Sequence, residues 1–275
     1  SPRERVTALA ANARRLLREL HALLIAPLAD ALAGYRQLIV VPHGSLHYLP
    51  FHALYDGETH LFEHHEISYL PGASVLRYCR ERQTPRHVTQ MAAFGYSWQG
   101  RLQHTVPEAQ QVARDLDGAA YVEEEATLAR LRSVLAGCRV LHLATHGDFR
   151  PDNPLFSGLV LADGWLTTFD IFGLRMAASL VTLSACQTGR SIVGGGDELM
   201  GLMRAFLYAG SASLLLTLWP VEDRSAAEIV HTLYGRLAAG WSKAAALRFA
   251  QRKALEHDHP YYWAPFYLVG DAGTL

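Results

Sequence analysis

The chain has 275 residues and a mass of 30.4 kDa; half of its residues are hydrophobic, 19% are charged, and the formal net charge is −1. This composition supports a full hydrophobic core and excludes a disordered or fibrous chain. Because the net charge is close to zero, direct binding to nucleic acid is not expected. The length fits one large domain or two small ones.

The cysteine content and the hydropathy pattern favour a cytoplasmic protein. Three cysteines, Cys79, Cys138 and Cys186, are too few for a disulfide scaffold. The longest apolar run, at residues 211–219, is shorter than the about 20 residues that span a bilayer, so no membrane partner is expected. The first 20 residues contain no signal-peptide core. Because the chain begins with Ser1, we expect an upstream region to precede it.

Helices and strands are predicted to alternate along the chain. Leucines spaced by four or seven predict a helix over residues 4–34 that is kinked or divided at Pro27, and turn residues in 43–72 favour hairpins. The predicted strands are 38–42, 91–95, 140–145, 159–161, 165–167, 181–185, 213–219 and 266–269. The other predicted helices are 107–116, 127–135, 198–209, 225–239 and 242–255. This alternation predicts an α/β fold with a mainly parallel sheet and helices on both faces.

The domain organisation is predicted to be simple. No repeat of solenoid period and no low-complexity linker divides the sequence. We expect a helical segment over residues 1–34, which would link to the upstream region, and one compact domain over residues 35–275.

Two predicted strand ends carry the residues of a candidate catalytic dyad. His146 and Gly147 follow the strand 140–145, and Cys186 follows the strand 181–185. Open parallel sheets place reacting groups just beyond the carboxyl ends of their strands, so neighbouring strands would bring His146 and Cys186 into one crevice. A histidine raises the thiolate fraction of a cysteine and then protonates the leaving group. The alternative is a buried packing cysteine and a simple His-Gly turn.

Several segments in a fixed order carry a family resemblance. They are residues 23–28, 39–54, the pair His146-Gly147, the run Ser184-Ala-Cys186-Gln-Thr-Gly189, and residues 195–210, 218–224 and 260–271. Together they resemble the CHAT domain family, a caspase-like peptidase module of the clan that includes caspases, metacaspases, gingipains and separase. The resemblance covers about residues 23–271, which is most of the chain.

The resemblance implies a caspase-like three-layer α/β/α sandwich with a mostly parallel central sheet and additional hairpins. It implies His146 as general base or acid and Cys186 as nucleophile; the backbone N–H groups of Gly147 and Cys186 are candidates for the oxyanion hole. Such domains commonly follow tetratricopeptide repeats in bacterial proteins. Some are defence proteases that a sensor or an RNA-guided effector complex activates and that cut a partner protein.

Substrate selection is expected from the wall of the crevice. Metacaspases use an acidic residue two positions before the cysteine, and this chain has Ser184 there; separase uses an acidic residue in a later loop, which corresponds to residues 221–224. We therefore predict Asp223, and less strongly Glu222, at the floor of an S1 pocket for Arg or Lys. A helix N-cap is the alternative role for Asp223. Asp197 and Glu198 are weaker candidates for the S1 acid, because Asp197 could equally cap the helix that begins there. Asp148 follows His146-Gly147 and is a candidate for orienting or screening the imidazole; its expected position on an exposed loop favours plain solvation instead.

Nothing in the sequence calls for a metal or a cofactor. The clustered histidines lie in predicted hairpins without a neighbouring cysteine, which is not the pattern of a zinc site; they are His43, His47, His52, His60, His64 and His65. The first hypothesis is thus a cysteine endopeptidase that cuts a specific partner protein after a basic residue. The second is a catalytically latent protein-binding or scaffold module. A thiol acyltransferase is disfavoured because Gly194–Gly196 does not form a dinucleotide-binding motif.

Overall fold

The computed structural model of the chain describes residues 2–81, 90–148, 150, 152–184, 197–219, 221, 223–255 and 259–275. The helices are α1 (Pro2–Leu24), α2 (Ala29–Leu32), α3 (Leu61–His64), α4 (Val75–Glu81), α5 (Thr105–Asp115), α6 (Leu128–Val134), α7 (Thr168–Phe172), α8 (Asp197–Ala209), α9 (Asp223–Ala238) and α10 (Lys243–Ala254). Within these residues, no helix is both long enough and apolar enough to cross a bilayer.

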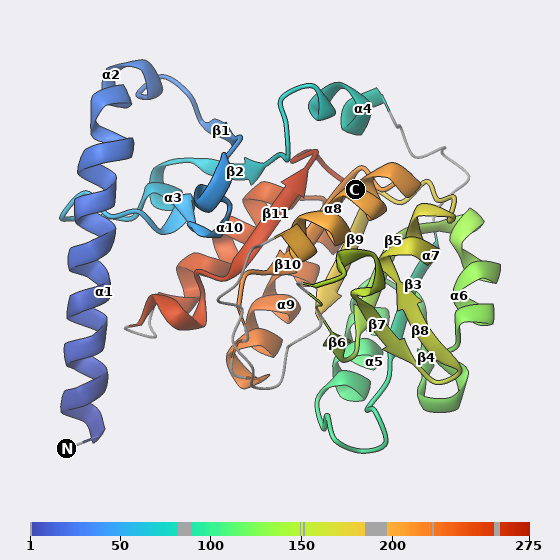
Figure 1. The fold of residues 1–275 in the computed structure, drawn as a ribbon. Helices are drawn as coiled ribbons and strands as arrows, with labels where there is room; N and C mark the ends of the chain where they lie inside the picture. Colours follow the sequence, from blue (N-terminus) through green and yellow to red (C-terminus); the bar gives the residue numbers. More distant parts are fainter. Residues whose placement is uncertain are drawn as a thin grey trace.

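An eight-stranded sheet runs through the centre of the chain in the order β1-β2-β11-β10-β9-β5-β3-β4 (Figure 1). Its strands are β1 (Gln37–Val40), β2 (Glu66–Tyr69), β3 (Gln90–Gly95), β4 (Ala119–Val122), β5 (Cys138–Ala144), β9 (Leu180–Ser184), β10 (Ser213–Thr217) and β11 (Phe266–Gly270). β10 and β11 pair antiparallel, and the other neighbours pair parallel. The carboxyl ends of β3, β5, β9 and β10 therefore share one edge of the sheet.

Helices cover both faces of this sheet, as the sequence predicts. Helices α5, α9 and α10 form one layer, in which α9 contacts both of the others. Tyr234 of α9 donates a hydrogen bond to Thr182 Oγ1 of β9 at 2.7 Å, so Val181 and Leu183 point to the opposite face. Figure 1 shows α8 on that opposite side, with α7 beside it. The central strands are buried on both faces, which explains their nearly continuous apolar sequences.

A second, three-stranded sheet follows the carboxyl end of β5. It consists of β6 (Gly147–Asp148), β7 (Gly158–Leu161) and β8 (Gly164–Thr167), all antiparallel. The hairpin predicted at Asp163-Gly164 is confirmed, with Gly164 at a φ of +151°. Asp148 belongs to β6 and not to a loop, but its side chain is 47% exposed, so the expected exposure holds. Because β6 pairs with β7, the backbone at Asp148 is part of the three-stranded sheet.

The first predicted helix is divided where expected, because a short 3-10 helix (Ala26–Leu28) that contains Pro27 separates α1 from α2. The hairpins expected in residues 43–72 are wrong. That stretch holds short helices and β2, and β2 pairs parallel with β1. Side chains satisfy its backbone locally: the Asp56 carboxylate accepts hydrogen bonds from the N–H groups of Glu58 and Thr59 at 2.7 and 2.8 Å. Such local bonds compete with strand pairing.

Candidate functional site

The candidate site lies where β5 and β9 end side by side. In the parallel register Ala144 is opposite Ser184, and the Thr145 N–H donates to the Ser184 carbonyl oxygen at 3.3 Å. The predicted adjacency of the two strands is thus confirmed. His146 follows β5 by two residues. Cys186 follows Ser184 by two residues and lies outside the described part of the chain.

Two tryptophans enclose the His146 ring. The Trp98 indole is stacked on the imidazole, with ring centroids 4.0 Å apart and an interplanar angle of 5°. The Trp165 ring meets the imidazole edge-on at 6.2 Å and 71°. Trp98 comes from the loop after β3, and Trp165 comes from β8. Both sheets therefore supply side chains that hold His146.

The surroundings keep His146 neutral at pH 7. Partial burial lowers the pKa of His146 below its usual value of about 6.5; Asp148 opposes this shift, and the Arg101 guanidinium adds to it. His146 Nδ1 is buried and has no hydrogen-bond partner among the described residues. A neutral imidazole can accept a proton, which is the property that a general base requires.

The backbone N–H of Gly147 points away from β7. The Val160 N–H donates to the His146 carbonyl oxygen at 2.9 Å, which makes these two residues a hydrogen-bonded pair of the antiparallel ladder. Hydrogen-bonded and non-hydrogen-bonded pairs alternate along such a ladder. The next pair, Gly147 with Leu159, is therefore non-hydrogen-bonded, and the Gly147 N–H is directed to the other side.

Ser184 lines a small cavity of about 10 Å³ between the carboxyl ends of β9 and β10 and the first half of α9. The described lining is mostly apolar; it consists of Thr182, Leu183, Ser184, Leu215, Leu216, Thr217, Ala226, Val230 and Phe266. Glu222 lies outside the described residues. Asp223 is the first residue of α9, one helical turn before Ala226, and its side chain is also outside the described part.

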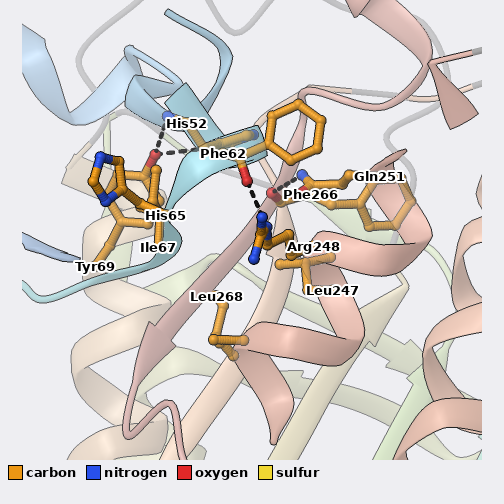
Figure 2. Close-up of a pocket in the computed structure, with 11 residues that line it drawn as sticks. His52, Phe62, His65, Ile67, Tyr69, Leu247, Arg248, Gln251, Phe266 and Leu268 are labelled. Carbon is orange, nitrogen blue, oxygen red and sulfur yellow. Dashed lines mark hydrogen bonds between the residues drawn. The ribbon is translucent and has the colours of Figure 1, made fainter. Parts of the chain in front are cut away.

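A second small cavity, of about 10 Å³, lies between β2, β11 and α10 (Figure 2). Its polar side chains are already bonded within the chain. His52 contacts the Tyr69 hydroxyl and the Ala264 carbonyl oxygen at 2.8 Å each. Arg248 donates to the carbonyl oxygens of Phe62, at 2.9 Å, and Glu63. The pocket is thus a packed part of the core and does not hold unsatisfied groups for a reaction.

The histidines considered for a metal serve other purposes where their contacts are defined. The ring of His60 contacts the Ala53 carbonyl oxygen at 2.7 Å, and the ring of His64 contacts Thr59 Oγ1 at 2.7 Å. No group of His, Cys, Asp or Glu side chains suited to a metal ion occurs in the described portion of the chain.

Sequence reasoning missed Trp98, Trp165 and Arg101. Arg101 lies 4.5 Å from the centroid of the Trp98 ring. The signal that was available is the position of Trp98, which follows a predicted strand end just as His146 and Cys186 do. The stacking itself depends on the conformation of the loop after β3, which no local pattern specifies.

The chain matches the profile of the CHAT domain over residues 14–271. It is 28% identical to tetratricopeptide repeat protein 28 of Mus musculus and to that of Homo sapiens over alignments that cover 92% of this chain. It spans only 13% of the length of these two relatives.

Solved structures with a similar fold include proteases of the predicted clan. One is the Saccharomyces cerevisiae separase–securin complex, with a TM-score of 0.57, 16% identity and coverage of 84% of this chain and 15% of that chain. Another is the Arg-specific cysteine proteinase gingipain R, with a TM-score of 0.52, 10% identity and coverage of 76% and 55%. At these identities the likeness concerns the fold alone. The caspase-like three-layer fold is thereby confirmed.

Proposed function

Because the chain belongs to the CHAT domain family, we propose that it is a cysteine endopeptidase that cleaves a partner protein through His146 and Cys186. The observation that carries the proposal is the shared end of β5 and β9, where a half-buried His146 with a lowered pKa precedes a segment with a cysteine two residues after Ser184. A dyad needs a neutral base near a thiol, and the register of the two strands supports that proximity.

The proposed reaction proceeds through an acyl-enzyme. His146 takes the proton of the Cys186 thiol and becomes an imidazolium. The thiolate attacks the scissile carbonyl carbon, and the carbonyl oxygen becomes an oxyanion that accepts hydrogen bonds from the N–H groups of Gly147 and Cys186. The C–N bond breaks as the His146 imidazolium donates its proton to the departing amine. His146 then takes a proton from water, the hydroxide attacks the thioester, and Cys186 leaves as thiolate. The orientation of Gly147 away from β7 supports its part in this step.

We propose a basic P1 residue, with Asp223 as its partner. The small cavity beside Ser184 has mostly apolar walls, which the aliphatic part of an Arg or Lys side chain would contact once the cavity widens to admit it. Asp223 starts the helix whose first turn reaches that pocket at Ala226. Glu222, the neighbouring acid, is the second candidate. A carboxylate at a helix N-terminus also interacts favourably with the helix dipole, so a purely structural role for Asp223 is the alternative that the test must separate.

The partner and the regulation are proposed from the relatives. Their name supports an association of this domain with tetratricopeptide repeats, and we propose that such repeats, or a sensor or effector complex, activate the protease. Both relatives are mammalian proteins, so a role in bacterial defence remains a proposal that rests on the family resemblance. A cytoplasmic location is likewise proposed from the low cysteine content.

The test is cleavage of a peptide library that carries every residue at P1, with and without the proposed activator. Wild type is compared with Cys186→Ala and His146→Ala; Cys79→Ala is the matched control because Cys79 is a buried cysteine on α4, away from the candidate site. Cleavage that requires Cys186 and His146 but not Cys79 is the expected result. Cleavage by Cys186→Ala would refute the dyad. Binding of the activator without cleavage by wild type would favour the latent binding module.

The P1 proposal has its own comparison in the same library. Wild type is expected to cut after Arg and Lys, and Asp223→Asn is expected to lose that preference while it keeps its thermal stability. If Asp223→Asn only lowers stability and still cuts after basic residues, Asp223 acts as a helix cap and the proposed S1 role is wrong.

A further inference from the structure

We infer that Trp98 is a positioning residue for His146: its indole ring fixes the plane of the imidazole and shields one face from water. The inference starts from the nearly parallel rings, whose centroids are 4.0 Å apart. The catalytic consequence of this role rests on the proposed peptidase function, whereas the positioning itself does not.

The loop that carries Trp98 is built to hold it in an unfavourable backbone conformation. Trp98 and Gln99 have φ values of +50° and +60°, a region that residues with a Cβ atom rarely adopt. Hydrogen bonds enforce it: the Gly100 N–H donates to Ser97 Oγ at 2.9 Å, and the Leu102 N–H donates to the Ser97 carbonyl oxygen at 2.9 Å. Strain of this kind persists where the surroundings over-determine it, and it is frequent at functional sites.

The same loop is tied to the strand that carries the histidine. The Tyr96 N–H donates to the carbonyl oxygen of Ala144, the last residue of β5, at 3.0 Å. The Ser97 N–H donates to Glu123 Oε2 at 3.3 Å. The first bond connects the start of the Trp98 loop to the end of β5, two residues before His146, and the second connects this loop to the residue that follows β4. The stacking therefore joins two anchored segments.

Stacking restricts His146 in a way that its own backbone does not. The bond from Val160 to the His146 carbonyl oxygen fixes the main chain, but the ring can still rotate about its side-chain bonds. Trp98 covers a face of the ring and Trp165 meets it edge-on at 6.2 Å, which limits that rotation. His146 Nδ1 is buried without a partner among the described residues, so no hydrogen bond identified there orients the ring. Aromatic packing supplies the orientation instead.

The charged groups around His146 act in opposite directions. Asp148 of β6 favours the imidazolium, and Arg101 of the Trp98 loop opposes it. The Arg101 guanidinium also contacts the Trp98 ring at 4.5 Å. Removal of the indole would admit water to the imidazole and free Arg101 from the ring. Both changes favour the charged form of His146, whereas loss of the indole face removes its attraction for an imidazolium. Burial is the largest cause of the lowered pKa of His146, so this pKa should rise toward about 6.5 when water enters.

A titration tests this role without any need for activity. The pKa of His146 is measured by NMR in protein labelled at histidine carbon, and its signal is identified by its loss in His146→Ala. Trp98→Ala should raise the pKa of His146, and Trp98→Phe should keep it near that of wild type because an aromatic face remains. Trp241→Ala is the matched control, since Trp241 packs on Phe249 beyond the end of α9. An unchanged pKa in Trp98→Ala, or equal shifts in the Phe and Ala variants, would overturn the proposal.

Kinetics add a readout that depends on the proposed function. For Trp98→Ala, kcat/KM on a cleaved peptide should fall on the order of 100-fold, the cost of a catalytic group displaced by about 1 Å. The acidic limb of the pH profile of kcat/KM should move to higher pH in Trp98→Ala, together with the pKa of His146. Trp98→Phe should restore most of the rate. A wild type that titrates as expected but never cleaves would refute the peptidase and leave the positioning role intact. A full rate in Trp98→Ala would refute the catalytic consequence.

Discussion

Acid should destabilise this domain through His52, a histidine that the proposed reaction does not use. His52 is 3% exposed, and its two ring nitrogens contact the Tyr69 hydroxyl and the Ala264 carbonyl oxygen. Figure 2 shows the contact with Tyr69. Burial lowers the pKa of His52 to about 3, which the bond to Ala264 opposes and the neighbouring His60 reinforces. In the unfolded chain the pKa of this histidine is about 6.5.

The sign and size of the effect follow from these two values. Between pH 6.5 and about 3 the unfolded chain binds a proton that folded His52 does not, so stability is lost as the pH falls through this window. At pH 5 the difference from pH 7 is about 2 kcal/mol, which is 1.36 kcal/mol for each of about 1.5 pH units below 6.5. For a domain that is stable by about 5–15 kcal/mol, this is a large fraction.

Urea unfolding at pH 7 and pH 5 measures this loss in wild type and in His52→Gln, a variant that keeps an amide donor near Ala264. The pH-dependent loss should be smaller by about 2 kcal/mol in His52→Gln. His43→Gln is the control, because His43 is an exposed histidine. Other buried histidines, such as His60, contribute loss of the same sign to all variants. An equal pH dependence in wild type and His52→Gln would refute the assignment of the acid sensitivity to His52.

Three further predictions concern stability and use urea or thermal unfolding. Gly210→Ala should destabilise by about 2 kcal/mol, since Gly210 has a φ of +123° and an added Cβ would lie 1.9 Å from a backbone carbonyl oxygen; Gly235→Ala, with open space on α9, should not destabilise. Thr127→Ala should cost about 1 kcal/mol, because Thr127 Oγ1 accepts the Arg130 N–H at the start of α6; full stability would refute that cap. Lys243→Ala should cost roughly 3 kcal/mol by breaking the buried 3.0 Å pair with Asp271, and a second change, Asp271→Asn, should recover part of the loss.

The central strands, including the two strand ends that precede His146 and Cys186, could be predicted because apolar runs bounded by turn residues favour buried strands. β5, β9 and β10 are buried on both faces, and each lies within two residues of its predicted bounds. The stretch 43–72 could not be predicted in this way. Its short segments are set by side-chain bonds such as that of Asp56 with Thr59, which leave no periodic signal.

The packing around His146 escaped prediction for a different reason. The stacking needs Trp98 and Gln99 in a left-handed conformation, which sequence rules assign to glycine, asparagine or aspartate. The hydrogen bonds from the Gly100 and Leu102 N–H groups to Ser97 stabilise it there. Local propensity therefore fails at Trp98, the residue that we infer to position His146. Functional and strained sites are where such failures are expected.

The parallel register of the central strands makes core stability and site geometry depend on the same side chains. Ala144 lies opposite Ser184 because buried residues such as Leu143 and Leu183, which pair in the row before, fix the register of β5 against β9. A shift by one residue would turn the apolar faces of a strand to the wrong layer, so it is strongly disfavoured. The spacing of two residues from each strand end then sets how far the chain runs to His146 and to Cys186. Substitutions that loosen this part of the core should therefore impair the proposed cleavage before they unfold the domain.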